Sequence, residues 1–124
     1  MSDSMFALVE AFVPKEILLH FDFVEVKKEY NVYRIYMLEK DDKSHYPSEL
    51  SDIPSVDVVK AGYLNPIELQ TFPIAGHEAF IYLRRRRWKQ KGSRETFHNS
   101  YDFMVEGTKS TRAFGAFLKE IGRG

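Results

Sequence analysis

Residues 67–83 read "IELQTFPIAGHEAFIYL", and this stretch decides the fold that we expect. Both halves are rich in β-branched and aromatic residues, which is typical of strands. The dipeptide Ala75-Gly76 separates the halves and is the natural turn. We therefore predict an antiparallel hairpin that pairs "IELQTF" with "EAFIYL", with Pro66 and Pro73 at a sheet edge or a bend.

The second arm of this hairpin runs directly into "RRRRWKQK" (84–91). Side chains of a strand alternate between its two faces. Four guanidinium groups do not bury without partners, so the outer half of the strand should project as a ribbon with arginines on both sides. The expected faces are Phe80, Tyr82, Arg84, Arg86 and Trp88 on one side, and Ile81, Leu83, Arg85 and Arg87 on the other.

The first part of the chain predicts a helix followed by a second hairpin. Apolar spacing indicates a helical segment over roughly 4–20, interrupted at Pro14. "FDFVEVKKEYNVYRIYMLEK" (21–40) is typical of two strands joined at "KKEYN". Residues 41–57 are polar and aperiodic, which indicates a loop in which "PSEL" could form one helical turn.

The last part predicts a third strand and a helix. "TFHNSYDFMVE" (96–106) is the strand, after a turn at "KGSR". An amphipathic helix over 109–121 follows, capped by Thr108 or Ser110, with an apolar stripe of Phe114, Phe117, Leu118 and Ile121 that ends at Gly122.

The predicted fold class is α+β: an N-terminal helix, an antiparallel hairpin, a long loop, a three-stranded antiparallel meander and a C-terminal amphipathic helix. A length of 124 residues suits one domain. Its expected parts are 1–40 (helix plus hairpin), 41–57 (loop) and 58–124 (basic meander plus helix).

The net charge of zero hides a division between the halves. Residues 1–59 hold 6 Lys+Arg and 12 Asp+Glu, a net charge of −6, whereas residues 60–124 hold 12 and 6, a net charge of +6. The halves could attract each other, or the basic half could face a polyanion.

Several classes of function lack their usual residues. The chain has no cysteine, which excludes disulfides, thiol catalysis and thiolate metal sites. No carboxylate pair, GxSxG elbow or phosphate loop occurs, so we expect no enzyme and no cofactor. No apolar window is long enough for a membrane span and no secretory signal begins the chain, so we expect a cytoplasmic protein. The histidines are far apart in sequence, which predicts no metal site: His20, His45, His77 and His98.

The basic run is the strongest functional signal. Residues 84–94 carry seven basic side chains without an intervening acid, and a basic ribbon can follow a phosphate backbone. Two alternatives stay open: an acidic protein partner, and pairing with the acidic first half inside the fold. The candidate nucleic-acid contacts are Arg84, Arg85, Arg86, Arg87, Trp88, Lys89, Lys91 and Arg94.

The aromatic residues allow two interpretations. They could form a platform on which bases stack. Core packing and cross-strand pairs are the commoner use of such residues, and we expect that use here. The set is Tyr33, Tyr36, Tyr63, Tyr82, Phe97, Tyr101 and Phe103.

"FPIAGHEAFIYLRRRRW" (72–88) and "GTKSTRAFGAFLKEI" (107–121) resemble the N-terminal region of split insertion-sequence transposases of Bacteroidetes-type bacteria. "VPKEILLHFDFVEVKKE" (13–29) resembles the start of those proteins. In that family a separate polypeptide carries the DDE catalytic domain. Longer relatives hold a similar hairpin in a zinc ribbon flanked by cysteine pairs; without cysteines, this chain should bind no zinc.

The resemblance implies a non-catalytic DNA-binding module that acts with the separate DDE polypeptide at the ends of a mobile element. Arg84–Arg87 and Trp88 would be the main DNA contacts, and Lys109 and Arg112 would face the catalytic polypeptide. The alternative is a protein-interaction module that binds an acidic partner. A homodimer would be one way to cover the edge strands near Pro66 and Pro73.

Overall fold

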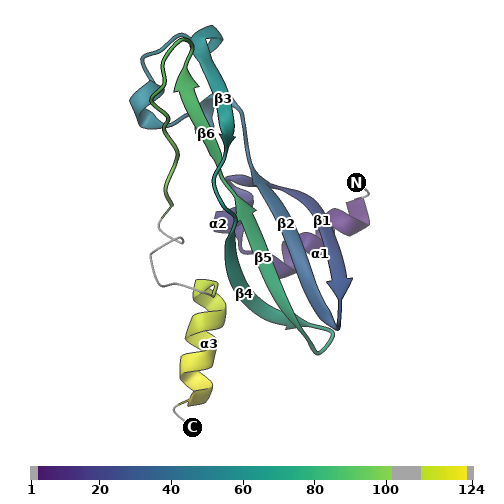
Figure 1. Ribbon diagram of the computed structural model, residues 1–124. Helices are drawn as coiled ribbons and strands as arrows, with labels where there is room; N and C mark the ends of the chain where they lie inside the picture. Colours follow the sequence, from purple (N-terminus) through teal and green to yellow (C-terminus); the bar gives the residue numbers. More distant parts are fainter. Residues whose placement is uncertain (1–2, 102–109, 123–124) are drawn as a thin grey trace.

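The computed structural model describes residues 3–101 and 110–122 (Figure 1). The predicted α+β class is confirmed, and strands make up most of the fold. The helices and strands of the described residues are α1 (Asp3–Phe12), α2 (Lys15–Leu18), β1 (Phe21–Glu29), β2 (Val32–Glu39), β3 (Val58–Tyr63), β4 (Ile67–Ile74), β5 (His77–Arg84), β6 (Arg86–Gln90) and α3 (Arg112–Gly122).

Two hairpins form a four-stranded sheet with the strand order β1-β2-β5-β4. Both predicted hairpins are confirmed, and their two-residue turns use positive φ angles, at Tyr30 and Asn31 and at Ala75 and Gly76. The hairpins join through β2 and β5, which run parallel and pair Ile35 with Ile81. The sequence predicted only antiparallel pairs, because a parallel contact between distant segments leaves no local pattern.

The strands of the second hairpin continue beyond this sheet. Only Arg85 separates β5 from β6, and three residues separate β3 from β4. The Leu64 N–H donates to the Arg85 carbonyl over 3.0 Å, so the pairing bridges both interruptions. The result is one long ribbon, half in the four-stranded sheet and half in the two-stranded β3-β6 sheet (Figure 1).

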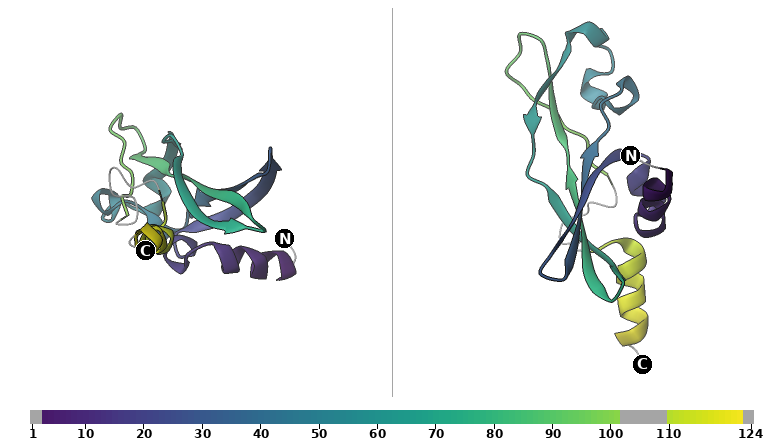
Figure 2. Two further views of the ribbon diagram at one scale, coloured as in Figure 1. Left: turned by 90° about the horizontal axis from the view of Figure 1, so that it is seen from below. Right: turned by 90° about the vertical axis from the view of Figure 1, so that its right-hand side faces the viewer.

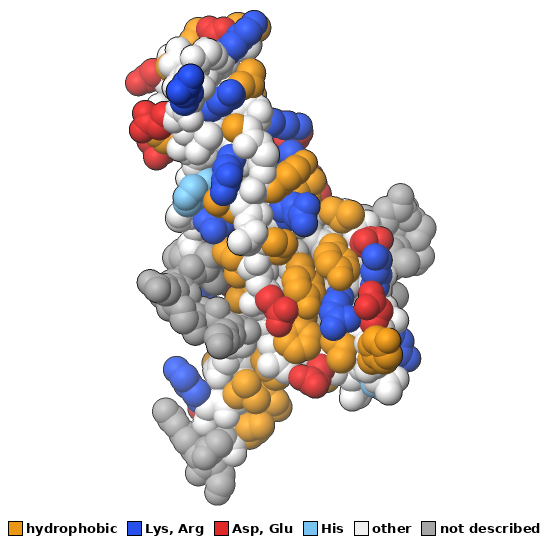
Figure 3. Space-filling model, viewed as in Figure 1, with side chains coloured by type: hydrophobic (Ala, Val, Ile, Leu, Met, Phe, Trp, Pro, Cys, Tyr) orange, Lys and Arg blue, Asp and Glu red, His pale blue; other side chains and the backbone are white. Residues whose placement is uncertain are grey.

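The main hydrophobic core lies between the four-stranded sheet and the N-terminal helices. Figure 2 shows α1 and α2 on one side of this sheet, with the other face uncovered. Figure 3 views that uncovered face, where hydrophobic and charged side chains are mixed. The buried core residues are Val9, Val13, Ile17, Phe21, Ile35, Met37, Leu69, Ile81 and Leu83.

A second, smaller core belongs to the β3-β6 sheet. Leu50, Val58 and Trp88 are its buried members, and Tyr46, Ile53 and Phe97 pack against them. The expected loop over 41–57 supplies part of this core. It forms three short 3₁₀ turns, at Lys43–His45, Ser48–Leu50 and Ser55–Asp57, and the second is the turn expected at "PSEL".

Two details of the C-terminal part differ from the expectation. Within the described residues, the third strand of the meander is reduced to an isolated bridge between Phe97 and Trp88; residues 102–106 lie outside them. Helix α3 begins at Arg112, not at 109, and its cap is Thr111, whose hydroxyl accepts a hydrogen bond from the Phe114 N–H at 3.3 Å. Thr111 takes the capping role expected of Thr108 or Ser110.

Candidate nucleic-acid interface

The buried positions of the arginine strand shift by one residue at Arg85. In β5, Ala79, Ile81 and Leu83 are buried, but in β6 the buried residues are Arg86 and Trp88. Uninterrupted alternation places these two with exposed Arg84. The Arg84 and Arg86 guanidiniums both lie near the Tyr63 ring, 5.4 and 5.8 Å from its centroid, which agrees with that grouping. The expectation that the outer half of the strand stays out of the core was wrong, because Glu39 binds Arg86 and the segment 41–57 packs against Trp88.

Arg86 is an internal residue, with only 7% of its surface exposed. Its backbone N–H donates to Glu39 Oε1 over 2.9 Å, and its Nε donates to the Glu39 carbonyl over 2.8 Å. An Asp41 carboxylate oxygen lies 4.0 Å from its Nη2. Pairing with the acidic first half therefore exists, and in the described part of the chain it involves this one arginine of the run.

Trp88 is the central residue of the smaller core and is 2% exposed. Its ring lies 4.9 Å from the Tyr46 ring. Its indole Nε1 is buried and has no hydrogen-bond partner among the described residues. Such burial does not fit the prediction that Trp88 stacks on a base.

Arg85 ties the segment after β6 to the ribbon. Its Nη1 donates to the Asn99 carbonyl over 3.0 Å and lies 3.3 Å from His98 Nδ1. The residue is half-buried, and its Nε is buried without a hydrogen-bond partner among the described residues. Arg85 is therefore mainly a structural residue.

The remaining five basic side chains of the run lie at the surface. Arg84, Arg87, Lys91 and Arg94 are exposed and Lys89 is half-buried. Within residues 3–101 and 110–122, none of the five forms an ion pair with a carboxylate. Figure 3 shows Lys and Arg side chains spread over the β3-β6 end of the molecule.

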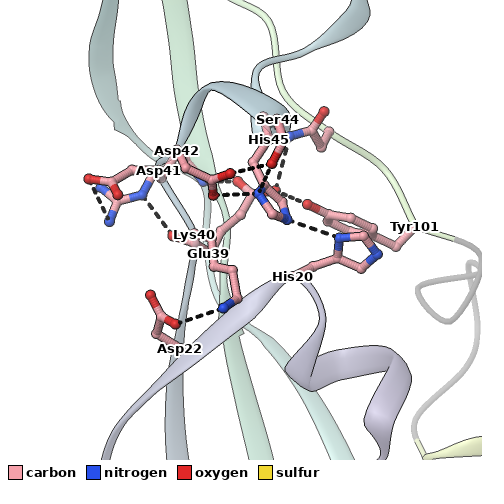
Figure 4. A network of polar contacts seen from close by, with 11 residues as sticks. His20, Asp22, Glu39, Lys40, Asp41, Asp42, Ser44, His45 and Tyr101 are labelled. Carbon is pink, nitrogen blue, oxygen red and sulfur yellow. Dashed lines mark hydrogen bonds and ion pairs between the residues drawn. The ribbon is translucent and has the colours of Figure 1, made fainter.

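A buried carboxylate lies where the two sheets meet (Figure 4). Glu39, at the end of β2, is 0% exposed. Besides the Arg86 N–H, its carboxylate accepts hydrogen bonds from Asn99 Nδ2 at 3.2 Å and from the Tyr101 hydroxyl. Burial and the neighbouring carboxylate raise the pKa of Tyr101 above its usual value of 10.0.

Two histidines that are 25 residues apart meet beside this carboxylate. His20 Nδ1 lies 3.2 Å from His45 Nε2, and His45 Nδ1 lies 2.6 Å from Asp42 Oδ1. Hydrogen bonds from Ser44 and from His45 lower the pKa of Asp42. Both ring nitrogens of His45 already have partners, so this chain of groups holds the loop in place. Sequence spacing gave no signal for it.

The candidate metal and docking residues have separate outcomes. Among the described residues, no three His, Asp or Glu side chains gather in a way that could hold a metal ion. Arg112 Nη1 lies 3.7 Å from Glu16 Oε2, so this residue has a partner within the chain. Lys109 lies outside the described residues.

Tyr36 and Tyr82 form an expected cross-strand pair, on the uncovered face of the four-stranded sheet, and Tyr63 lies beside them rather than in the core. Tyr36 and Tyr82 are half-buried neighbours on β2 and β5, with ring centroids 5.2 Å apart and planes at 18°. Tyr63 is 47% exposed, and the Arg84 guanidinium lies 5.4 Å from its ring centroid. The exposed aromatic surface and the exposed cations are thus adjacent.

Comparisons with protein-family models, with curated proteins and with solved structures found no match to this chain. In the part of the chain that the structure describes, none of the helices has the length and apolar character needed to cross a membrane. The function is therefore argued from the residues and their geometry.

Proposed function

We propose that this chain is a non-catalytic module that binds nucleic acid through the phosphate backbone. The observation that carries the proposal is the group of five surface cations without ion-pair partners in the described part of the chain. We call it the basic patch: Arg84, Arg87, Lys89, Lys91 and Arg94.

The placement of these residues suits a polyanion. Arg87 and Lys89 alternate with buried Arg86 and Trp88, so they project from the opposite face of β6. Lys91 and Arg94 continue the charge into the turn after this strand. Lys and Arg side chains that neutralise neighbouring phosphates displace the small cations condensed on the nucleic acid, and the release of those cations drives binding at low salt.

The transposase setting rests on the sequence resemblance. In that setting the nucleic acid is the DNA at the ends of an insertion sequence, and a separate DDE polypeptide supplies catalysis. Helix α3 supports a protein contact, because Phe117, Leu118 and Ile121 are exposed on it. These apolar residues are better docking candidates than Arg112, which pairs with Glu16.

The second candidate function is a protein-interaction module whose basic patch binds an acidic protein. The same surface cations favour it, since carboxylates and phosphates both attract guanidinium groups. The two functions differ in the response to DNA, which the following experiment measures.

The test is fluorescence anisotropy of a labelled DNA duplex titrated with the purified chain at low and near-physiological salt. The variant replaces three exposed members of the basic patch, Arg87, Lys91 and Arg94, by alanine. The control removes the same charge from exposed lysines elsewhere, Lys15, Lys28 and Lys119. Circular dichroism checks that both variants fold.

We expect the patch variant to weaken duplex binding at least about tenfold and to reduce the salt slope by about one for each phosphate that is no longer neutralised. The control should stay within about threefold of the parent chain. Equal losses in both variants would mean that only net charge matters. Absence of binding at low salt would exclude the nucleic-acid function and leave the acidic protein partner.

A further inference from the structure

A hollow on the uncovered sheet face opens beside the basic patch. Its volume is about 430 Å³, which lies within the range of about 300–1,000 Å³ found for small-ligand sites. Strands β1, β2, β4 and β5 pair side by side beneath this face. Aromatic, aliphatic and charged side chains line the hollow, including Tyr36, Tyr63, Tyr82, Pro66, Lys27 and Arg84.

The aromatic residues of the hollow are held in place before any ligand arrives. Tyr36 and Tyr82 stack on each other, and the Tyr82 hydroxyl accepts a hydrogen bond from Arg34 Nε over 3.3 Å. Tyr63 extends from β3 and is contacted by the Arg84 guanidinium. Tyrosines fixed in this way present π-faces and edges at little entropic cost.

The charge of the hollow favours an anion at one end. Lys27 Nζ lies 3.5 Å from Glu25 Oε1, so these two lining charges offset each other. Arg84 also lines the hollow and forms no ion pair with a carboxylate in the described part of the chain. Arg84 is therefore shared between the hollow and the basic patch.

We propose that this hollow is a subsite for an unpaired nucleobase of a single-stranded segment, with the base against Tyr63 and the Tyr36–Tyr82 pair and its phosphate at Arg84. The inference rests on the proposed nucleic-acid function and adds the form of nucleic acid that the chain prefers. Stacking on tyrosine is open to every base, because every base has a π-face. A base inside a duplex is already stacked and paired, so it cannot enter.

The test compares a labelled single strand with the duplex of the same sequence, titrated by anisotropy with the full chain. Tyr63→Ala removes the exposed ring, and Tyr63→Phe keeps the ring without the hydroxyl. The control is Tyr30→Ala, because Tyr30 is 96% exposed at the turn of the β1–β2 hairpin and does not line the hollow. A strand that carries 5-bromodeoxyuridine, irradiated on the parent chain, gives crosslinks that mass spectrometry assigns to residues.

We expect Tyr63→Ala to weaken single-strand binding about 5- to 150-fold, the effect of removing the stacking of one base. Duplex binding should change less than about twofold, and Tyr63→Phe and Tyr30→Ala should resemble the parent chain. Crosslinks should fall on Tyr36, Tyr63 or Tyr82.

Other results overturn the inference. If Tyr63→Ala and Tyr30→Ala bind the single strand equally while the patch variant loses affinity, the hollow is not a base site and the proposed function stands. Crosslinks confined to residues outside the hollow lead to the same conclusion. If the parent chain binds neither form at low salt, the inference and the proposed function both fail.

Discussion

The two halves of the β3–β4/β5–β6 ribbon come from the same pair of chain segments but are stabilised differently. The β4–β5 half is covered by α1 and α2 and shares nine buried hydrophobic residues with β2 and the N-terminal segment. The β3–β6 half buries three, and short 3₁₀ turns pack around them. The smaller half carries most of the basic patch.

This difference indicates how charge and stability are distributed along the ribbon. Where the sheet is wide and helix-covered, alternate residues can all be apolar on the inner face. Where it narrows to two strands, one tryptophan and one buried arginine occupy the inner positions of β6. The outer positions can then hold cations that the fold does not require, and mutations there should affect binding more than stability.

The largest expected effect is that of Trp88→Ala, which tests whether the smaller core depends on one side chain. Removing a buried tryptophan should lower the free energy of unfolding by about 3–5 kcal/mol. Hydrogen exchange should show that β3 and β6 lose amide protection before β2 and β5. Trp88→Phe keeps an aromatic ring and removes the indole N–H that has no partner among the described residues. This variant should lower the free energy of unfolding much less. Equal loss of protection in all four strands would mean that the halves unfold together.

Glu39→Ala should have the next largest effect, because Glu39 joins the two halves. The change leaves the Arg86 N–H, Asn99 Nδ2 and the Tyr101 hydroxyl without this acceptor. At about 1 kcal/mol for each hydrogen bond, denaturant unfolding should show a loss of about 3 kcal/mol.

Glu78→Ala is the matched control, since Glu78 is an exposed glutamate of β5. It should stay within about 0.5 kcal/mol of the parent chain. Similar losses for the two glutamates would remove the special role of Glu39.

Tyr101 should make stability sensitive to alkaline pH. Its pKa in the folded chain is raised, mainly by burial and then by Glu39, above the value of 10.0 that applies when it is unfolded. Its contribution is therefore complete below pH 10 and is lost as pH rises through the folded pKa, because the unfolded chain ionises first. The melting temperature should fall above pH 10.

Tyr101→Phe should remove that part of the alkaline decrease and cost about 1 kcal/mol at neutral pH. Thermal unfolding of both proteins between pH 7 and pH 11 measures this. Identical pH profiles would show that other tyrosines or lysines cause the decrease.

The smallest expected effect is a gain in the β4–β5 half from Ala75→Gly. Ala75 has a φ of 50°, a conformation that costs an alanine about 1 kcal/mol or more. The greater freedom of glycine in the unfolded chain offsets part of this relief, leaving about 0.5 kcal/mol of stabilisation in denaturant unfolding. Gly76→Ala, at a φ of 80°, should instead destabilise the chain. A loss from Ala75→Gly would show that the turn is unstrained.

Local features could be predicted from the sequence. The broken N-terminal helix, both hairpins and the turn at Ala75-Gly76 follow from propensity and turn residues that lie close together in the chain. The pairing of β2 with β5 could not be predicted, because it depends on which sheet edge is left for the second hairpin. The contact between His20 and His45 could not be predicted either, because the two residues are 25 positions apart in the chain.

The candidate site was predicted only in part, because the charge of the run was taken to keep its whole outer half at the surface, whereas the segment 41–57 covers one face of β6. One signal was available in Trp88 itself. A tryptophan gains much from burial, and burying it places Arg86, two residues earlier, on the same inner face. That reasoning would have separated Arg86 and Trp88 from the basic patch before the structure was known.

The parallel pairing of β2 with β5 also affects how fast the chain folds. Each hairpin can form within a short loop, but the parallel pair joins position 33 to position 79, and the intervening chain includes β3 and all three 3₁₀ turns. Contacts between positions so far apart in sequence are slow to form, because the entropy of closing the loop is lost before the contact stabilises anything. The two hairpins should therefore form early, and their association should limit the folding rate. Until then, β2 and β5 each have an unpaired edge that another molecule could pair with.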